Sequence, residues 1–234
     1  MTDAAADDPF ASDFADLVGF DAVHRRRYEA RGFHVGGDTL LIRGVVDDEA
    51  PPHVTIPGDD RPLQFHHMVV DVRVDIVTTV IESVEVRFDT HPHATCPTIA
   101  AAYQQLVGSS MARGYTNRVK ELFGGPRGCT HVVALLQAMA PVLAQARWPM
   151  LSRLHAGEAV HNPDRPPPDP EQRRMLARAN LNTCHMWAED GELMTQVDQG
   201  AAVPVPSPIL RRMRELGVDP DVWTQRTQPG RRAR

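Results

Sequence analysis

The stretch Phe65-His66-His67-Met68-Val69-Val70-Asp71-Val72-Arg73-Val74-Asp75-Ile76 alternates apolar and charged side chains over most of its length. An alternation with a period of two is typical of a β-strand that has one buried face and one face in water. Counting back along this strand places His66 on the apolar face, whereas His67 lies on the other side. A histidine aligned with the core can be a structural residue, but it can also point into a site.

Three further strands are expected around this one. Residues 80–88 show the same alternation and follow closely enough to pair with it as an antiparallel hairpin. Before it, residues 24–45 form two strands around the turn Gly36-Gly37-Asp38, and Asp47-Asp48 is expected to end the second of them. The sequence therefore predicts four antiparallel strands between about residues 24 and 88.

Helical patterns follow the strands. Pro97 is suited to the first position of a helix that runs to Gly108, and a second short helix is expected over residues 116–123. The turn Gly124-Gly125-Pro126-Arg127-Gly128 then leads into a long apolar helix, which is expected to end before Pro149. The predicted fold class is α+β, a four-stranded antiparallel sheet packed against a layer of helices drawn from residues 97–148.

The predicted organisation has three parts. Residues 1–20 form a flexible acidic arm, residues 21–200 form a single α+β domain, and residues 201–234 form a linker and a C-terminal helical tail. Within the domain, residues 156–170 are rich in proline and charge and are expected to be a loop.

Composition narrows the class of protein. The chain has 234 residues, of which 42% are hydrophobic and 24% charged, and its net charge is −5, which argues against a nucleic-acid partner. No apolar run approaches the roughly 18 residues that span a bilayer, and the N-terminus is acidic, so a cytoplasmic protein without a membrane partner is expected. The three cysteines suit reduced thiols or metal ligands better than disulfides. A homo-oligomer is compatible with the sequence.

The candidate chemistry lies in the cysteines and histidines. Cys129 begins the long helix two residues before His131, where the helix dipole favours a thiolate. Cys96 lies at another predicted helix start, and Cys184 stands beside His185. Either Cys129 is a nucleophile with His131 or His66 as its base, or zinc or iron is held by Cys96, Cys129, His131 and Cys184. A third alternative is that these residues only support the core.

Two arginines offer a place for substrate. Arg25 and Arg26 could hold an anionic group, since guanidinium clamps carboxylate or phosphate, or they could form a solvated strand face. The sequence favours a small-molecule enzyme with metal- or thiolate-assisted lyase or hydrolase chemistry on an anionic organic substrate. The alternatives are a non-enzymatic metal or iron–sulfur carrier, and an interaction module.

An ordered series of motifs resembles a bacterial family called domain of unknown function 2889. The series, which extends from about residue 22 to residue 195, is His24-Arg25-Arg26, Gly44 to Asp47, Phe65-His66-His67-Met68, Cys96-Pro97, Leu106-Val107-Gly108, Gly128-Cys129-Thr130-His131 and Cys184-His185-Met186-Trp187-Ala188-Glu189-Asp190-Gly191. This resemblance supports the fold and nominates residues, but it implies no particular reaction. A looser similarity of arrangement to NifU-type iron–sulfur scaffold proteins, which also use three separate cysteine motifs, implies the carrier alternative.

Overall fold

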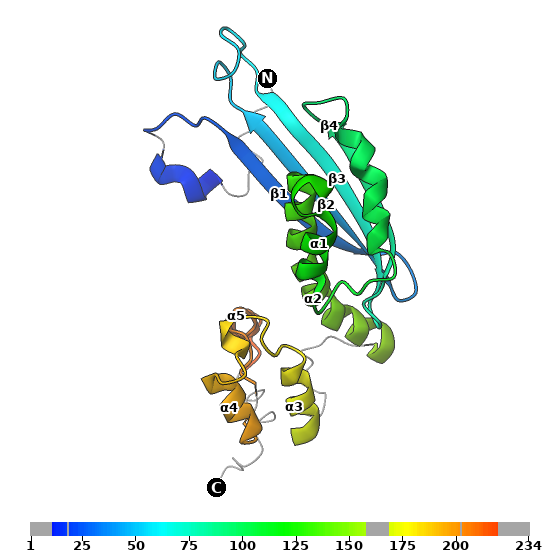
Figure 1. Cartoon of the computed structure of the whole chain (residues 1–234). Helices are drawn as coiled ribbons and strands as arrows, with labels where there is room; N and C mark the ends of the chain where they lie inside the picture. The colour runs from blue at the N-terminus through cyan, green and yellow to red at the C-terminus, as the bar shows by residue number, and fades with distance from the viewer. Residues whose placement is uncertain (1–10, 18, 158–168, 202, 220–234) are drawn as a thin grey trace. The chain divides into compact units, whose positions relative to one another are not determined.

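A computed structural model describes residues 11–17, 19–157, 169–201 and 203–219. The chain divides into two compact units, Met1–Val160 and His161–Arg234 (Figure 1). The division falls within the proline-rich segment 156–170, whereas the sequence suggested one domain from residue 21 to residue 200. Most of that segment, and most of the predicted acidic arm, lies outside the described residues, apart from a short 3-10 helix, η1 (Ala11–Leu17).

The first unit is built on a four-stranded sheet, as predicted. Its strands are β1 (Arg25–His34), β2 (Thr39–Ala50), β3 (Leu63–Asp75) and β4 (Ile81–Thr90), and each is antiparallel to its neighbour in the order β1-β2-β3-β4. Strand β2 does not end at Asp47-Asp48 as expected. It continues to Ala50, because Asp48 and Ala50 are still buried and pair with His66 and Leu63 of β3, with a bulge between Asp48 and Glu49.

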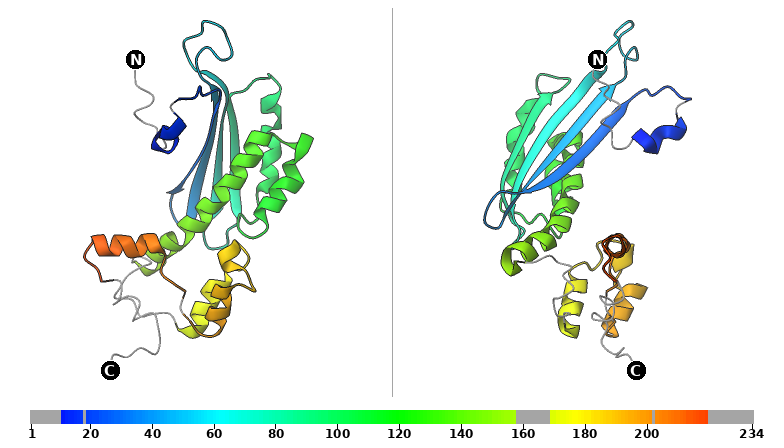
Figure 2. Two further views of the ribbon diagram at one scale, coloured as in Figure 1. Left: turned by 90° about the vertical axis from the view of Figure 1, so that its left-hand side faces the viewer. Right: turned by 180° about the vertical axis from the view of Figure 1, so that it is seen from behind.

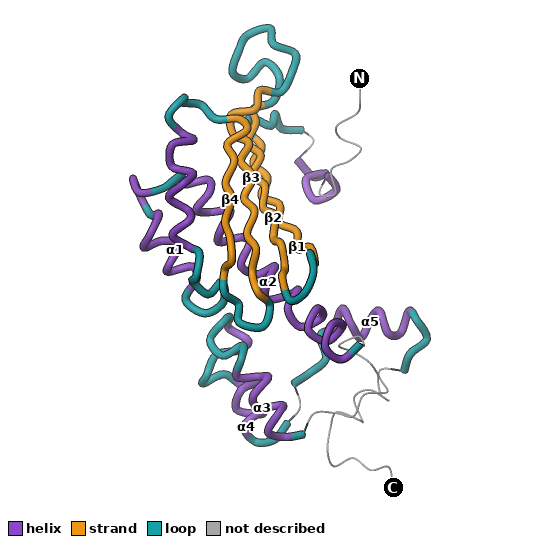
Figure 3. Tube along the Cα trace, turned by 90° about the vertical axis from the view of Figure 1, so that its right-hand side faces the viewer, coloured by secondary structure: helices purple, strands orange, loops and turns teal. Residues whose placement is uncertain are grey.

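Helices cover one face of this sheet. They are the 3-10 helix η2 (Cys96–Leu106), α1 (Tyr115–Phe123), the short 3-10 helix η3 (Gly125–Arg127) and the long α2 (Thr130–Ala156). Figures 2 and 3 show the strands side by side with η2, α1 and α2 on one side. Apolar side chains of the covered face and the helices form one core, which includes Ile42, Val70, Val72, Tyr103, Val119, Leu135 and Met139. The α+β architecture is therefore confirmed.

Two glycines let α2 lie close to the sheet. A Cβ atom on Gly44 of β2 would lie only 2.6 Å from the sulfur of Met139, and one on Gly32 of β1 would lie 3.2 Å from Val142. Real Cβ atoms essentially never come within 3.0 Å of another heavy atom, so a side chain at residue 44 would force α2 or its side chains to move. The absence of a side chain at Gly44 therefore sets how closely α2 packs on β2.

The long helix was expected to end before Pro149, but it continues through Pro141 and Pro149 to Ala156. A proline inside a helix removes one backbone hydrogen bond and crowds the preceding turn. Packing outweighs this cost here. Arg147 donates hydrogen bonds to the carbonyls of Ile76 and Val77, at 2.6 and 3.1 Å, and Met150 is buried in the core.

The second unit is small and helical. It contains α3 (Pro170–Arg178), the 3-10 helix η4 (His185–Trp187), α4 (Glu192–Asp198) and α5 (Ser207–Glu215). Asp169 caps α3 by accepting hydrogen bonds from the backbone N–H groups of Glu171 and Gln172. Ala177, Met194 and Val197 form a separate minor core. Across the part of the chain that the structure describes, no helix combines the length and apolar character needed to cross a membrane.

Candidate functional site: a carboxylate, two imidazoles and a thiol

A buried carboxylate lies on the helix-covered face of the sheet. Asp48 of β2 is 1% exposed and pairs in register with Arg26 of β1 and His66 of β3, so the three side chains share one face. Arg26 Nη2 donates to Asp48 Oδ2 at 2.6 Å, and His66 Nδ1 lies 2.9 Å from the same oxygen. His24, just before β1, contacts the other oxygen, Oδ1, through Nε2. Neighbouring strands therefore surround one carboxylate with three basic side chains.

The start of α2 brings a second imidazole and a thiol to this carboxylate. His131 Nε2 lies 3.4 Å from Asp48 Oδ2, and its ring stacks on His66 with 3.9 Å between the ring centroids. The sulfur of Cys129 lies 3.8 Å from the other ring nitrogen of His131, Nδ1. The thiol thus contacts the imidazole of His131, and that imidazole in turn contacts the carboxylate.

Local sequence explains why Cys129 is held there. A Cβ on Gly128 would lie 2.6 Å from the carbonyl oxygen of Phe123, so only glycine fits this close turn before α2. Cys129 is the residue that precedes the first turn of α2, and its backbone N–H donates to the hydroxyl of Tyr103 at 2.9 Å. Tyr103 comes from η2 and is completely buried, and burial raises the pKa of its hydroxyl to about 12. A protonated, packed tyrosine therefore fixes the backbone of Cys129.

The surroundings set the charge states of the two central groups. Burial by itself raises the pKa of Asp48, but hydrogen bonds from Arg26 and His66 outweigh burial and hold the pKa of this carboxyl below its usual value. Burial lowers the pKa of His131, and the charges of His66 and Arg26 lower it further, against the opposing effect of Asp48. At neutral pH the carboxyl is therefore ionised and the His131 imidazole is neutral.

These charge states also assign the protons. An ionised carboxylate only accepts hydrogen bonds, so the ring nitrogens that face it carry hydrogen, namely Nδ1 of His66 and Nε2 of His131. A neutral imidazole has one N–H and one lone pair, so His131 Nδ1 presents its lone pair to the sulfur of Cys129. This tautomer is the one that can accept a proton from the thiol.

The structure brings together part of the residue set nominated from the sequence. His131, His66 and Arg26 contact Asp48, and Cys129 contacts His131. Arg25 lies on the opposite face, where it pairs with Glu49 at 2.8 Å and with Asp47 at 3.5 Å.

The other two cysteines belong to other elements. Cys96 begins η2 and is partly buried, and Cys184 is exposed ahead of η4 in the second unit. Among the described residues, the group of three or more side chains placed to hold a metal consists of Asp48, His66 and His131, and it contains no cysteine. The four-residue ligand set Cys96, Cys129, His131 and Cys184 therefore stays a prediction.

Sequence reasoning missed Asp48, the residue at the centre of the cluster, because Asp47-Asp48 looked like the end of a strand. A signal was present. Asp48 continues the alternate positions that Leu40, Ile42, Gly44 and Val46 occupy on the core side of β2. An acidic residue in phase with a buried face is costly unless basic groups or hydrogen bonds compensate it, so such a position is worth inspecting.

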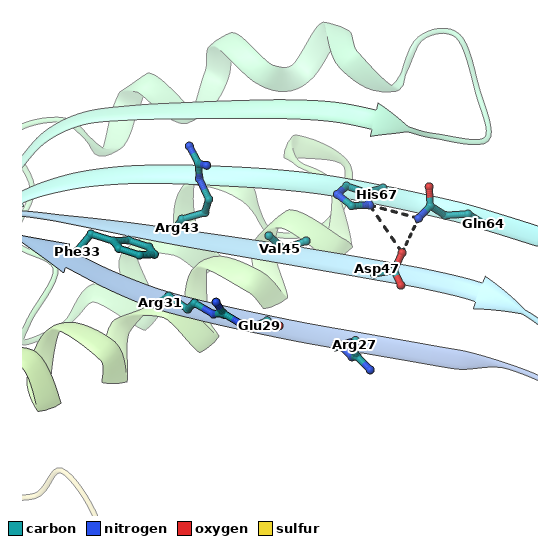
Figure 4. A pocket seen from close by; sticks show the side chains of 9 residues that line it. All are labelled: Arg27, Glu29, Arg31, Phe33, Arg43, Val45, Asp47, Gln64 and His67. Atoms are coloured by element: carbon teal, nitrogen blue, oxygen red, sulfur yellow. Dashed lines mark hydrogen bonds and ion pairs between the residues drawn. The ribbon is translucent and has the colours of Figure 1, made fainter. Parts of the chain in front are cut away.

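The uncovered face of the sheet holds a separate shallow depression of about 470 Å³. Figure 4 shows the side chains that line it, including Arg27, Asp47, Gln64 and His67. Gln64 donates to Asp47 at 2.6 Å, and His67 lies 3.8 Å from the same oxygen. No cysteine lies among its lining residues.

Fold and site together define an α+β protein with a thiol–imidazole–carboxylate cluster on one covered sheet face. A family model described as "Protein of unknown function (DUF2889)" matches residues 24–145, just over half of the 234-residue chain, and the chain belongs to this family. The match begins at His24, ends within α2 and includes every residue of the cluster. No curated protein and no solved structure matches the chain, and the looser similarity to NifU-type scaffolds gains no support.

Proposed function

We propose that this protein is a small-molecule enzyme that uses Cys129 as a nucleophile, with hydrolysis of an acyl compound as its reaction. The observation that carries the proposal is the connection from Cys129 Sγ to His131 Nδ1, at 3.8 Å, and from His131 Nε2 to Asp48 Oδ2, at 3.4 Å. A nucleophile, a base and a group that orients the base, each within reach of the next, form the arrangement that nucleophilic enzymes share.

Each group has a defined role in the proposed reaction. The lone pair on His131 Nδ1 accepts the proton of the Cys129 thiol, and the thiolate attacks the carbonyl carbon of the substrate. The bond to the leaving group breaks, the leaving group takes the proton from His131, and a thioester remains on Cys129. Water then attacks the thioester with His131 again as base, which releases the acid and restores the thiol. Asp48 stabilises the imidazolium that forms in each step.

The charges around the cluster favour a substrate with an anionic group. The side chains of Arg26 and His24 are 42% and 43% exposed beside the buried carboxylate, so both can contact a bound molecule while they contact Asp48. Arg25 is not part of this proposal, because it pairs with acidic residues on the opposite face. The non-enzymatic iron–sulfur carrier is the weaker candidate, since such clusters are held mainly by cysteine thiolates.

A burst assay on the full chain tests the proposal. With p-nitrophenyl acetate, one equivalent of p-nitrophenol per chain should be released rapidly, and mass spectrometry should find the acetyl group on Cys129. Cys129→Ala should abolish the burst, and His131→Gln should slow it by about 100-fold or more, which is the usual contribution of a general base.

Cys96→Ser is the matched control, because Cys96 is also partly buried and also begins a helical segment. It should leave the burst unchanged. A burst that survives Cys129→Ala, or an acetyl group distributed over all three cysteines, would show that the thiol of Cys129 has no special reactivity.

A further inference from the structure

The side chains around Asp48 also have the composition of a metal site. Asp48, His66 and His131 each offer one ligand atom, and these atoms all lie within 4.8 Å of one another. Asp48 Oδ2 is 2.9 Å from His66 Nδ1 and 3.4 Å from His131 Nε2. Two ligands at about 2.1 Å from a tetrahedral ion lie about 3.4 Å apart. The distance from Asp48 to His131 already fits this value, and the distance from Asp48 to His66 would have to lengthen by about half an ångström.

One oxygen of the carboxylate, Asp48 Oδ1, has no hydrogen bond of normal geometry within the described residues. This oxygen is buried, and the imidazole of His24 is in contact with it. A carboxylate oxygen that is shielded from water and not satisfied by a hydrogen bond gains more than an exposed one from a cation. The site is also accessible to a small ion, since the side chains of His66 and His131 are 18% and 14% exposed.

We propose that Asp48, His66 and His131 bind a divalent transition metal ion of the zinc class. Two imidazole nitrogens and one carboxylate oxygen suit zinc and its first-row neighbours, whereas calcium and magnesium prefer oxygen ligands. Three protein ligands leave a coordination position for water or for substrate. This set differs from the cysteine-rich set suggested by the sequence, because the ligands come from β2, β3 and α2 of the first unit alone.

Arg26 opposes the ion. Its guanidinium donates at 2.6 Å to Asp48 Oδ2, the oxygen closest to both histidines, and so competes with a cation for the same lone pairs. The Arg26 side chain is 42% exposed and can turn towards solvent when an ion enters. Because like charges repel at this range, the loss of the guanidinium should strengthen metal binding.

Metal binding would also control the chemistry of Cys129, a consequence that rests on the proposed function. An ion on His131 Nε2 replaces the proton there, and the neutral ring then carries its proton on Nδ1. Nδ1 can donate to the sulfur of Cys129 but can no longer accept the thiol proton. The ion and the thiol reaction should therefore exclude each other at this site.

Metal titration of the chelator-treated full chain tests the site without any substrate. Calorimetry with Zn²⁺ and the visible absorption of bound Co²⁺ should show one ion per chain at the cluster. His66→Gln should weaken binding by more than about 100-fold, the upper end of the loss when only an outer-shell partner of a ligand is removed. Arg26→Gln should tighten binding by about tenfold, after allowance for the partial exposure of the arginine.

Two controls separate this site from the thiol reaction and from general surface binding. Cys129→Ala should bind the metal normally, because Cys129 is not one of the three ligands, so the metal proposal survives even if the thiol proposal fails. His67→Gln should also bind normally, since His67 lies one residue away on the opposite face.

A measurement on the unmodified protein covers the case in which His66→Gln does not fold. Zn²⁺ should protect His66 and His131 from diethylpyrocarbonate and leave His67 reactive, as mapped by mass spectrometry. The proposal is overturned if micromolar Zn²⁺ and Co²⁺ do not bind, if His66→Gln folds and binds as tightly as wild type, or if the ion protects His66 no more than His67.

Discussion

The two faces of the sheet carry the same three residue types side by side, but among the described residues only the covered face joins them to a second histidine and a cysteine. On the covered face, Arg26, Asp48 and His66 pair across β1, β2 and β3, and on the open face Arg27, Asp47 and His67 do the same one residue further along. Asp48 is 1% exposed and its contacts with Arg26 and His66 are 2.6 and 2.9 Å, whereas the Asp47 side chain is 20% exposed and lies 3.8 Å from His67.

The difference between these two rows of side chains, Arg26-Asp48-His66 (the covered row) and Arg27-Asp47-His67 (the open row), comes from α2. The start of the helix contributes His131, which lies beside the buried Asp48, and places Cys129 beside His131. On the open face, Asp47 is partly exposed and is contacted by Gln64, by Arg25 at 3.5 Å and by His67 at 3.8 Å. Residue type and cross-strand pairing are therefore insufficient for a site. The covering helix adds an imidazole and a thiol to a row of ion pairs, and the ionised carboxylate then determines which ring nitrogens carry hydrogen.

The largest expected difference in the free energy of unfolding is between variants of the two aspartates, Asp48 and Asp47. Asp48→Asn should lower the free energy of unfolding by about 3–4 kcal/mol, because it leaves several basic groups facing a site without its charge. Asp47→Asn should cost less than about 1 kcal/mol, as is usual for partly exposed ion pairs. Urea unfolding followed by circular dichroism would measure both. Equal losses would mean that coverage by α2 does not distinguish the two rows.

The fold could be predicted from the sequence because β3 and β4 largely alternate apolar and polar side chains and because glycine and proline mark the turns. His66 could be placed on the covered face and His67 on the open face by counting alone, and both placements agree with the structure. Asp48 could not be recognised in the same way. Its role depends on β2 continuing past Asp47 and on the first turn of α2 lying above it, which are tertiary facts.

The cysteines show the same limit. Local sequence placed Cys96 and Cys129 at helix starts, and the structure agrees, with Cys96 as the first residue of η2 and Cys129 as the cap of α2. Local sequence contained nothing to say that the imidazole beside Cys129 would face a carboxylate from β2. Contacts between residues far apart in sequence depend on packing, and packing here depends on glycines such as Gly44.

A side chain at residue 44 tests whether α2 creates the difference between the rows. Gly44→Val should lower the free energy of unfolding by about 2–3 kcal/mol, because the new atoms would overlap Met139 and Leu135. It should also make Asp48 more exposed, so a second change of Asp48→Asn should cost less in this background than in wild type. Gly19→Ala is a suitable control, since a Cβ there meets no atom within 4 Å. If the losses from Gly44→Val and Asp48→Asn simply add in the double variant, the packing of α2 does not cause the difference between the two rows.

The pH dependence of stability tests the charge state of the covered row. The pKa of Asp48 in the folded protein lies below its unfolded value of about 3.9, because hydrogen bonds from Arg26 and His66 outweigh burial. Its ionised form therefore contributes stability that is fully present above about pH 5 and is lost as the pH falls through the folded pKa.

The measurement compares wild type with Asp48→Asn by urea unfolding between pH 3 and pH 7 in the presence of a chelator. The difference in unfolding free energy should be constant at neutral pH and should shrink below about pH 4. A difference that grows on acidification would mean that the carboxyl is protonated in the folded protein, which would remove the charge that orients both imidazoles.

The smallest expected effect belongs to the open face, where the best-formed ion pair joins β2 to β3. Arg43 donates from Nε and Nη2 to the two oxygens of Asp71, at 2.7 and 2.6 Å, and half of its side chain is exposed to solvent. Arg43→Gln should cost less than about 1 kcal/mol, and the loss should fall further in high salt because mobile ions screen exposed charges. Urea unfolding in low and high salt measures this loss, and Arg26→Gln is compared under the same conditions.

The covered pair, Arg26 and Asp48, should be less sensitive to salt than Arg43 and Asp71, since Asp48 is withdrawn from water. Equal salt sensitivity would show that water and ions reach both faces of the sheet alike.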